Sequence, residues 1–289
     1  MTKRFEGTFL AEDDAELFYQ VWKPSKKSRG TVLITHGLAE HSECYNDLAY
    51  SLNEDLWTVV GWDLRGHGRS EGKRGYVRHF ENYIDDLHRF IHFLKEQSFY
   101  VSPLILLGHS MGGLITLQML LIYGQHHVDA VTLSSPALEV AVEVPFWKEK
   151  LAKVLAQYLP TITLYNEISY SDLVRDPQVI QSYESDPLRH DKISPMVFLG
   201  MQEGFVFVQS KAHEIKLPLL LQVAGQDKIV STQASKDFFQ NVASPLKKLI
   251  EYPKSYHEIF KDLDKEKVIA DYKEFIDSLP LKKAEVSKK

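Results

Sequence analysis

The chain contains a single cysteine, Cys44, among its 289 residues, so it cannot form an intrachain disulfide. This cysteine usage fits a reducing compartment. No apolar run approaches the ~20 residues that a membrane-spanning helix needs. The first seven residues lack the apolar segment of a signal peptide. We therefore expect a cytoplasmic protein.

The chain also lacks an excess of positive charge. It carries 34 lysines and arginines against 39 aspartates and glutamates, which gives a formal net charge of −5. Proteins that bind nucleic acid depend on a basic surface, so we expect no nucleic-acid partner. The one basic excess lies in residues 282–289, which we interpret as a solvated tail. The length permits one α/β domain or two smaller ones.

Hydrophobic patterning predicts strands that alternate with helices over most of the chain. Short apolar runs predict strands at 31–35, 57–62, 104–107, 130–134, 218–224 and 248–252, after two strands within residues 5–22. Helical spacing of apolar residues predicts helices over 45–52, 80–94, 114–123, 232–242 and 268–276. This alternation is typical of a mostly parallel sheet with helices on both faces.

The alternation stops between Pro136 and Lys216. An amphipathic helix is predicted over 147–158, residues 169–194 receive no element, and residues 195–207 are apolar on nearly every side. We interpret residues 136–216 as a cap inserted above the carboxyl ends of the strands, where open α/β sheets bind ligands. Residues 1–135 and 217–289 then form the core. The alternative is a separate helical bundle without a catalytic role.

A Gly-x-Ser-x-Gly motif occupies residues 108–112 (GHSMG), between a predicted strand and a predicted helix. In this context the motif forms a sharp turn that exposes the serine hydroxyl above the sheet. Ser110 would then lie at a helix N-terminus, whose partial positive charge favours a developing anion. The alternative is a glycine-rich turn with an ordinary serine.

A serine nucleophile needs a base, and the base needs an orienting acid. In this kind of motif the chain order is serine, acid, histidine. Asp227 follows the strand at 218–224, and His257 follows the strand at 248–252. The alternative makes Asp227 a turn residue and His257 a loop histidine. We expect the backbone N–H groups of Leu38 and Met111 to bind an oxyanion.

Three motifs together carry a resemblance to a known family. They are residues 36–42 (HGLAEHS), 63–72 (DLRGHGRSEG) and 108–113 (GHSMGG), with supporting matches at 185–188 and 224–227. The chain resembles the monoacylglycerol lipase and lysophospholipase group of the α/β-hydrolase superfamily. The resemblance implies a mostly parallel eight-stranded sheet with a helical cap, a Ser110–Asp227–His257 triad, and neither cofactor nor metal. It also implies substrates that are esters of one fatty acyl chain with a small polar head.

The chain departs from this group at three positions. Leu38 stands where a small residue is usual, Cys44 where an arginine is usual, and Phe260 where the animal lipases have a second histidine. Glu40 is retained, and it is expected to accept a hydrogen bond from the head group. Its alternative role is a charge at the start of the following helix.

Several residues of the insert and of the preceding loops are candidates for substrate contact. Phe198, Met201, Phe205 and Phe207 could line an acyl tunnel, where each buried methylene contributes about 0.8 kcal/mol, or could form the core of the cap. Arg65, Lys73 and Arg74 are candidate partners of a phosphate head. The histidines His36 and His67 are expected to hold loops.

We therefore predict a serine hydrolase that cleaves carboxylic esters of single-chain lipids. Monoacylglycerol-type esters are the first choice and lysophospholipids the second. Acyl transfer on the same triad and a binding protein without catalysis are alternatives. A peptidase is disfavoured because the insert shows no acidic cluster that would bind an amine terminus. Contact of the apolar cap with a membrane surface is a further hypothesis.

Overall fold

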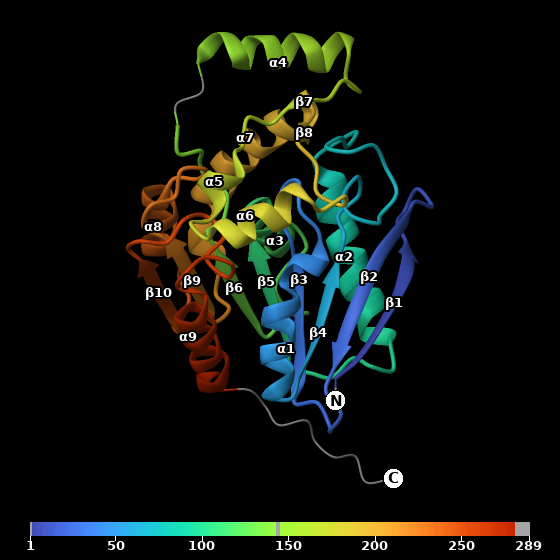
Figure 1. The fold of residues 1–289 in the computed structure, drawn as a ribbon, viewed down its shortest axis with the longest axis vertical. Coiled ribbons are helices and arrows are strands. Elements are labelled where there is room, and N and C mark those ends of the chain that lie inside the picture. Colours follow the sequence, from blue (N-terminus) through green and yellow to red (C-terminus); the bar gives the residue numbers. More distant parts are fainter. Residues whose placement is uncertain (1, 143–144, 281–289) are drawn as a thin grey trace.

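The computed structural model describes residues 2–142 and 145–280, so the basic residues at 282–289 lie outside the described part. Its centre is an eight-stranded sheet in the order β1-β2-β4-β3-β5-β6-β9-β10 (Figure 1). The first two strands run antiparallel to their neighbours, and the strands from β4 to β10 are parallel. The strands of this sheet are β1 (Lys3–Leu10), β2 (Glu16–Lys23), β3 (Gly30–Thr35), β4 (Trp57–Trp62), β5 (Leu104–His109), β6 (Ala130–Ser134), β9 (Leu219–Ala224) and β10 (Lys247–Tyr252).

Helices cover both faces of this sheet, as the sequence predicts. Those of the core are α1 (Asn46–Glu54), α2 (Glu81–Glu96), α3 (Met111–Ile122), α8 (Thr232–Asn241) and α9 (Lys265–Ser278). One hydrophobic cluster joins α1 and α9 to one face of the sheet. A larger cluster joins α2, α3 and α8 to the other face. The fold class predicted from the sequence is therefore confirmed.

The central strands are buried along their whole length. Every residue of β3, β4, β5 and β6 is buried. Parallel strands covered by helices on both faces have no solvated side. This explains why the sequence shows continuous apolar runs there instead of the alternation of a half-exposed strand.

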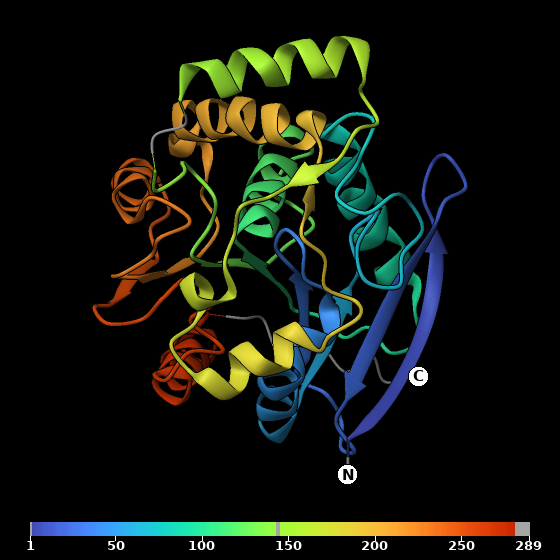
Figure 2. The same cartoon turned by 45° about the horizontal axis from the view of Figure 1, so that its top comes forward.

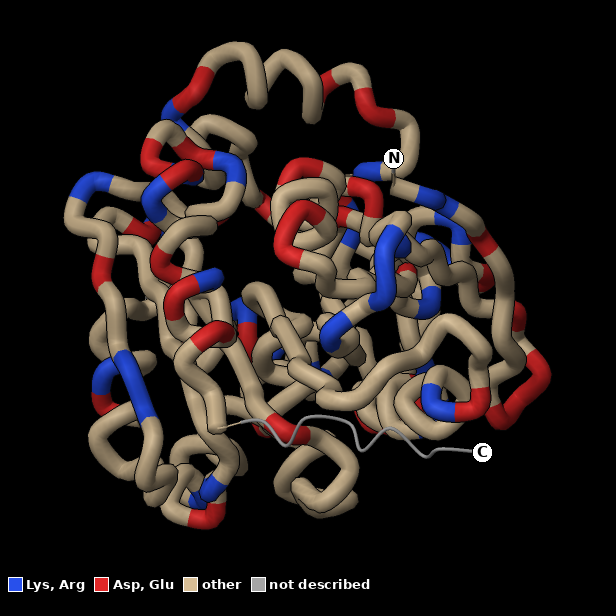
Figure 3. The backbone as a smooth tube through the Cα atoms, turned by 90° about the horizontal axis from the view of Figure 1, so that it is seen from below, with Lys and Arg blue, Asp and Glu red and all other residues tan. Residues whose placement is uncertain are grey.

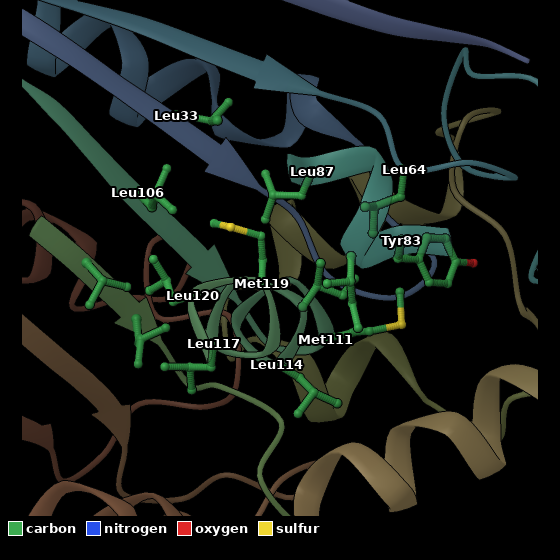
Figure 4. Packing of buried hydrophobic residues seen from close by; sticks show 14 of the residues in the cluster. Leu33, Leu64, Tyr83, Leu87, Leu106, Met111, Leu114, Leu117, Met119 and Leu120 are labelled. Atoms are coloured by element: carbon green, nitrogen blue, oxygen red, sulfur yellow. The ribbon is translucent and has the colours of Figure 1, made fainter. Parts of the chain in front are cut away.

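Helix α3 is surrounded by apolar side chains and carries Ser110 at its start. Its residues Leu114 and Leu117 point into the cluster that also contains Tyr83 and Leu87 of α2 (Figure 4). Each of these side chains is at most 1% exposed. A helix packed on all sides cannot shift without opening the core, so α3 fixes the position of its own N-terminus.

The insert, which we define as residues 136–216, covers the carboxyl ends of the strands. It contains α4 (Phe146–Tyr158), β7 (Leu164–Tyr165), α5 (Tyr170–Leu173), α6 (Pro177–Glu184), β8 (Lys192–Ile193) and α7 (Pro195–Ser210). Helix α7 packs on α3, and α4 packs on α7 as the outermost layer (Figure 2). The described part of the insert thus packs on α3 on the side of the sheet where the strands end.

The structure adds elements to residues 169–194, to which the sequence analysis assigned none. Helix α6 begins after Asp176, whose side chain accepts a hydrogen bond from the Gln178 amide, and Pro177 occupies its first turn. An Asp-Pro pair is a recognised helix start. Its apolar residues Val179, Ile180 and Tyr183 share one face, but eight residues are too short to show a repeating apolar pattern, and α6 was missed for that reason.

No helix in the described ranges is long and apolar enough to cross a membrane. Basic and acidic residues are mixed along the described backbone (Figure 3). Arg65, for example, pairs with Asp86 of α2 at 2.9 Å and with Asp13 at 2.7 Å. The Arg65 charge is therefore balanced by neighbouring acids.

Candidate active site

Ser110 occupies a strained turn between β5 and α3. Its backbone angles are φ 51° and ψ −122°, a left-handed conformation that residues other than glycine rarely adopt. The turn is tightly enclosed, because a Cβ atom on Gly112 would lie 2.2 Å from the Thr35 carbonyl oxygen. A side chain at Gly108 would likewise lie 2.7 Å from the Gly113 Cα. The two motif glycines therefore permit the close approach of strand, helix and loop.

Three residues from distant parts of the chain form one hydrogen-bonded chain at this turn. His257 Nε2 lies 2.9 Å from Ser110 Oγ. His257 Nδ1 lies 2.8 Å from Asp227 Oδ2. Asp227 follows β9 and His257 follows β10. Because these neighbouring strands are parallel, both side chains lie at the same edge of the sheet. The structure thus brings together the three residues that the sequence predicts.

The acid and the histidine stabilise each other in a buried setting. Burial acts to lower the pKa of His257, but the Asp227 carboxylate outweighs it and raises that pKa above its ordinary value. Burial acts to raise the pKa of Asp227, but His257 and two amides lower it. These amides are the N–H groups of Ile229 and Val230, which donate to Asp227 Oδ1 at 2.9 and 3.0 Å. Asp227 is therefore an ionised, fixed acceptor.

The loop after β3 lies against the serine. A Cβ atom on Gly37 would be 3.0 Å from Ser110 Cβ, and Leu38 lines the cavity above the serine. Glu40 holds this loop, because its Oε1 accepts from the Gly37 amide at 2.6 Å and from the Tyr45 hydroxyl at 2.8 Å. Within the described residues, neither the Leu38 N–H nor the Met111 N–H donates to another group.

His36 and His67 hold loops, as the sequence suggests. The His36 Nδ1 donates to the Gly37 carbonyl at 2.7 Å, and its Nε2 accepts from the Leu64 amide at 2.9 Å. The His67 Nδ1 donates to the Arg65 carbonyl at 3.1 Å. Burial lowers the pKa of both imidazoles, which keeps them neutral.

A cavity of about 490 Å³ opens above Ser110 and His257, a size typical of small-molecule sites. The loop at 37–40 forms one wall. Segments of the insert around β7, α5 and α6 form the other. Its apolar lining comes from Leu38, Ile168, Leu173, Ile180 and Ile229.

The apolar residues of α7 that the sequence analysis selected lie elsewhere. Phe198, Met201, Phe205 and Phe207 are not among the residues that line this cavity. Phe205 is buried in the main core, and Met201 and Phe207 pack against it. Helix α7 presses close to α3, since a Cβ on Gly204 would lie 3.2 Å from Leu114 Cδ2. Met201, Phe205 and Phe207 pack against the core because α7 lies between α3 and α4.

The sequence analysis missed a buried cation in the cavity wall. Arg189 of the insert lies 3.2 Å from the carboxylate of Glu258, which directly follows His257. Its guanidinium is also 3.8 Å from Glu40 and stacks 3.6 Å over the Tyr183 ring. The Tyr183 hydroxyl donates to Glu258. Arg189 and Glu258 are far apart in the chain, so no sequence pattern predicts that they meet. The supporting motif at 185–188 lies directly before Arg189 but does not indicate its partner.

Cys44 and Phe260, two of the positions at which the chain departs from the family pattern, have clear places in the structure. Cys44 belongs to the Arg189 cluster, and Phe260 belongs to the core. The Arg189 guanidinium donates to Cys44 Sγ at 3.5 Å, and Phe260 is buried against Tyr272. The three cations proposed for a phosphate head do not line the cavity. Arg65 pairs with acids, Lys73 donates to the Thr161 carbonyl, and Arg74 donates to the Gly68 carbonyl.

Comparisons with known proteins identify relatives over most of the chain. The family model described as serine aminopeptidase, S33 matches residues 26–264. A monoacylglycerol lipase of Mycolicibacterium smegmatis is 30% identical, covering 94% of this chain and 97% of that protein. The phospholipase YtpA of Bacillus subtilis is 30% identical, over 89% of this chain and 98% of that protein.

Solved structures show the same relationship. The crystal structure of the Paleococcus ferrophilus monoacylglycerol lipase superposes with a TM-score of 0.80 at 30% identity, over 96% of this chain and 98% of that chain. The predicted resemblance and the prediction of a carboxylic ester hydrolase are confirmed. The chain therefore belongs to the hydrolase family described as serine aminopeptidase, S33, within the α/β-hydrolase superfamily.

Proposed function

We propose that this protein hydrolyses monoacylglycerol-type esters through a covalent acyl-enzyme. The observation that carries the proposal is the unbroken hydrogen-bonded chain from Asp227 through His257 to Ser110 at the floor of the cavity. A serine hydroxyl becomes nucleophilic when an adjacent base accepts its proton.

Acylation follows from this geometry. Ser110 Oγ attacks the ester carbonyl carbon while His257 Nε2 accepts the hydroxyl proton. Asp227 keeps the imidazole in the correct tautomer and stabilises the imidazolium. The free N–H groups of Leu38 and Met111 bind the oxyanion of the tetrahedral intermediate. The intermediate collapses, and the alcohol leaves with the proton from His257.

Deacylation repeats the sequence with water as nucleophile. His257 removes a proton from the water that attacks the acyl carbonyl, and the fatty acid leaves as Ser110 recovers its proton. The acyl chain lies against the apolar wall made by Leu38, Ile168 and Ile180. Each methylene buried there contributes about 0.8 kcal/mol.

Charge in the cavity favours a neutral head group. Arg189 is the one lysine or arginine among the described residues of its lining, and Glu258 already pairs with it. The other charged groups there are the carboxylates of Glu40, Glu184 and Asp191. An anionic phosphate head would meet a net negative wall, whereas a glycerol head would meet hydrogen-bonding groups. Lysophospholipids are for this reason the second choice.

A peptide substrate is less well supported by the same lining. An amine terminus needs a free carboxylate, but the buried ones are engaged: Glu258 pairs with Arg189, and Glu40 accepts two hydrogen bonds. Of the two exposed carboxylates in the lining, Asp191 pairs with Lys192 at 2.9 Å, and Glu184 stands alone as the acidic residue of α6. Ester hydrolysis therefore remains the function that the geometry favours.

We further propose that the outer face of the insert contacts a lipid surface. Helix α4 exposes Phe146, Trp147 and Tyr158, which are 68%, 61% and 71% accessible. The helix carries Lys148, Lys150 and Lys153 against Glu149, and a net positive charge suits anionic head groups. Lys148 and Lys153 pair with Glu167 and Glu149, which leaves Lys150 to contribute most. Leu151 and Val154 between the aromatic residues are also exposed, and so many exposed apolar side chains along one helix are unusual on a surface without a partner. Contact there would place the cavity close to its lipid substrate.

Loss of the nucleophile should abolish turnover. With p-nitrophenyl esters of rising chain length, Ser110→Ala should lower kcat by roughly 10⁶-fold, while the wild type shows a chain-length optimum. Ser135→Ala is the matched control, because Ser135 is also buried beside the turn and its hydroxyl has no partner among the described residues. Equal activity of the Ser110 variant and the wild type would remove Ser110 from the mechanism.

The pH dependence should report the state of His257, which acts as a base only when neutral. Activity should fall as pH decreases through the pKa of His257, and because Asp227 raises that pKa, the wild-type midpoint of kcat/KM should lie above 6.5. Asp227→Asn removes the carboxylate, so the residual activity, about 10⁴-fold lower, should titrate at lower pH. An unchanged midpoint in that variant would contradict the assignment of Asp227.

Head-group charge should decide the substrate preference. At equal acyl length, kcat/KM should be higher for a monoacylglycerol than for a lysophosphatidylglycerol. The double variant Glu184→Gln/Asp191→Asn should narrow this difference severalfold, and Asp237→Asn on α8 should leave it unchanged. Faster turnover of the anionic substrate, or hydrolysis of an aminoacyl anilide in preference to both esters, would contradict the proposal.

Vesicle binding should depend on helix α4. The wild type should co-sediment with vesicles of phosphatidylcholine and phosphatidylglycerol, and Phe146→Glu/Tyr158→Glu should stay in the supernatant. Leu10→Glu/Leu263→Glu is the control, since those side chains are 58% and 60% exposed on other surfaces. Equal recovery of all three proteins in the supernatant would exclude membrane contact through α4.

A further inference from the structure

Four of the twelve histidines form one cluster outside the cavity. His88 and His92 lie on α2, one helical turn apart. His126 and His127 lie in the connection between α3 and β6. None of the four lines the cavity above Ser110. The proposed reaction assigns them no role.

The two helical histidines already face each other at a distance suited to chelation. Their Nε2 atoms are 3.1 Å apart. Two nitrogens bound to one tetrahedral zinc at 2.0–2.1 Å lie about 3.3 Å from each other. Histidines spaced by four residues on a helix are a recognised metal-binding pair. In the metal-free protein only one proton can occupy the space between these atoms.

Neighbouring rings extend and orient this pair. The His127 ring centre is 4.7 Å from that of His92, and the His126 ring is 3.8 Å from that of His127. His88 stacks on Tyr123 with ring centres 3.9 Å apart and planes within 4°. The Tyr123 hydroxyl in turn donates to Asp85 at 2.7 Å. The stacking partner restricts the rotation of the His88 ring.

We propose that His88 and His92 form a two-histidine surface site for a borderline divalent metal ion such as Zn²⁺, Ni²⁺ or Cu²⁺, with His127 next to the pair. Imidazole nitrogens suit these ions and do not suit Mg²⁺ or Ca²⁺, which prefer oxygen ligands. The remaining coordination positions are open to water.

The charges around the cluster are compatible with a bound cation. The Asp85 carboxylate faces His88 and would attract a bound cation. Arg89 and Lys95 oppose it, but Arg89 is engaged with Glu12 at 3.2 Å.

A second group of metal-ligand types fits a cation less well. His41, Cys44 and Asp186 bring their side chains together beside the cavity. His41 Nε2 already donates to Asp186 at 2.8 Å. Against burial, Cys44 and Asp186 raise the pKa of His41 to about 9, so its ring is protonated. Arg189 also lies 3.5 Å from Cys44 Sγ and would repel a metal ion.

Metal titration of the full chain tests the proposal. The protein, freed of metal with a chelator, is titrated with Zn²⁺ in a calorimeter and with Cu²⁺ by electron paramagnetic resonance. The wild type should bind one ion and show nitrogen ligands in the Cu²⁺ spectrum. Binding should raise Tm by mass action. His88→Gln/His92→Gln should weaken the Zn²⁺ affinity by about tenfold or more, and His127→Gln should weaken it to a smaller degree.

Two controls make the result decisive. His79→Gln changes another exposed histidine near the start of α2 and should leave the affinity unchanged. Esterase activity without metal should be equal in the wild type and in His88→Gln/His92→Gln, which shows that the variant is folded. Absence of Zn²⁺ binding in the wild type, or unchanged binding in the double variant, would overturn the proposal. Loss of binding in Cys44→Ala would assign the ion to the buried group instead.

Discussion

The structure depends on one tight backbone contact, the packing of the turn at Ser110 against the end of β3. The contact exists because Gly112 has no Cβ, which allows the Thr35 and His36 carbonyls to approach it. The buried helix α3 then holds Ser110 in its left-handed conformation. Strain of this kind persists only when the surroundings over-determine it. Strands β9 and β10 end at the same edge of the sheet. Asp227 and His257, which follow them, therefore reach Ser110 and complete the hydrogen-bonded chain.

A second constraint joins the insert to this frame. Arg189 is buried between Glu258, which follows His257, and Glu40, which belongs to the loop after β3. Removing one member of such a buried cluster leaves an uncompensated charge. The insert is therefore held at the cavity by electrostatics on its inner side, while α4 on its outer side exposes apolar surface.

The same cluster gives the cavity its chemical character. Cys44 leaves room beside Glu40, and Arg189 reaches this space from the insert. Glu258 neutralises Arg189, so the other charged groups that line the cavity, Glu40, Glu184 and Asp191, leave a negative balance around Ser110 and His257. The proposed preference for a neutral head group follows from these few residues, while the fold itself is common to the family.

The sequence by itself determined the sheet, the serine turn and the order of Ser110, Asp227 and His257, because these rest on local signals: buried apolar runs, motif glycines and strand ends. It also determined family membership, through three motifs that act together. Only the tertiary structure decided which residues form the cavity wall. Phe205 faces the core because α7 lies between two other helices, and Arg189 meets Glu258 across a long stretch of chain. No local sequence pattern predicts either contact, because both depend on how the insert packs onto the sheet.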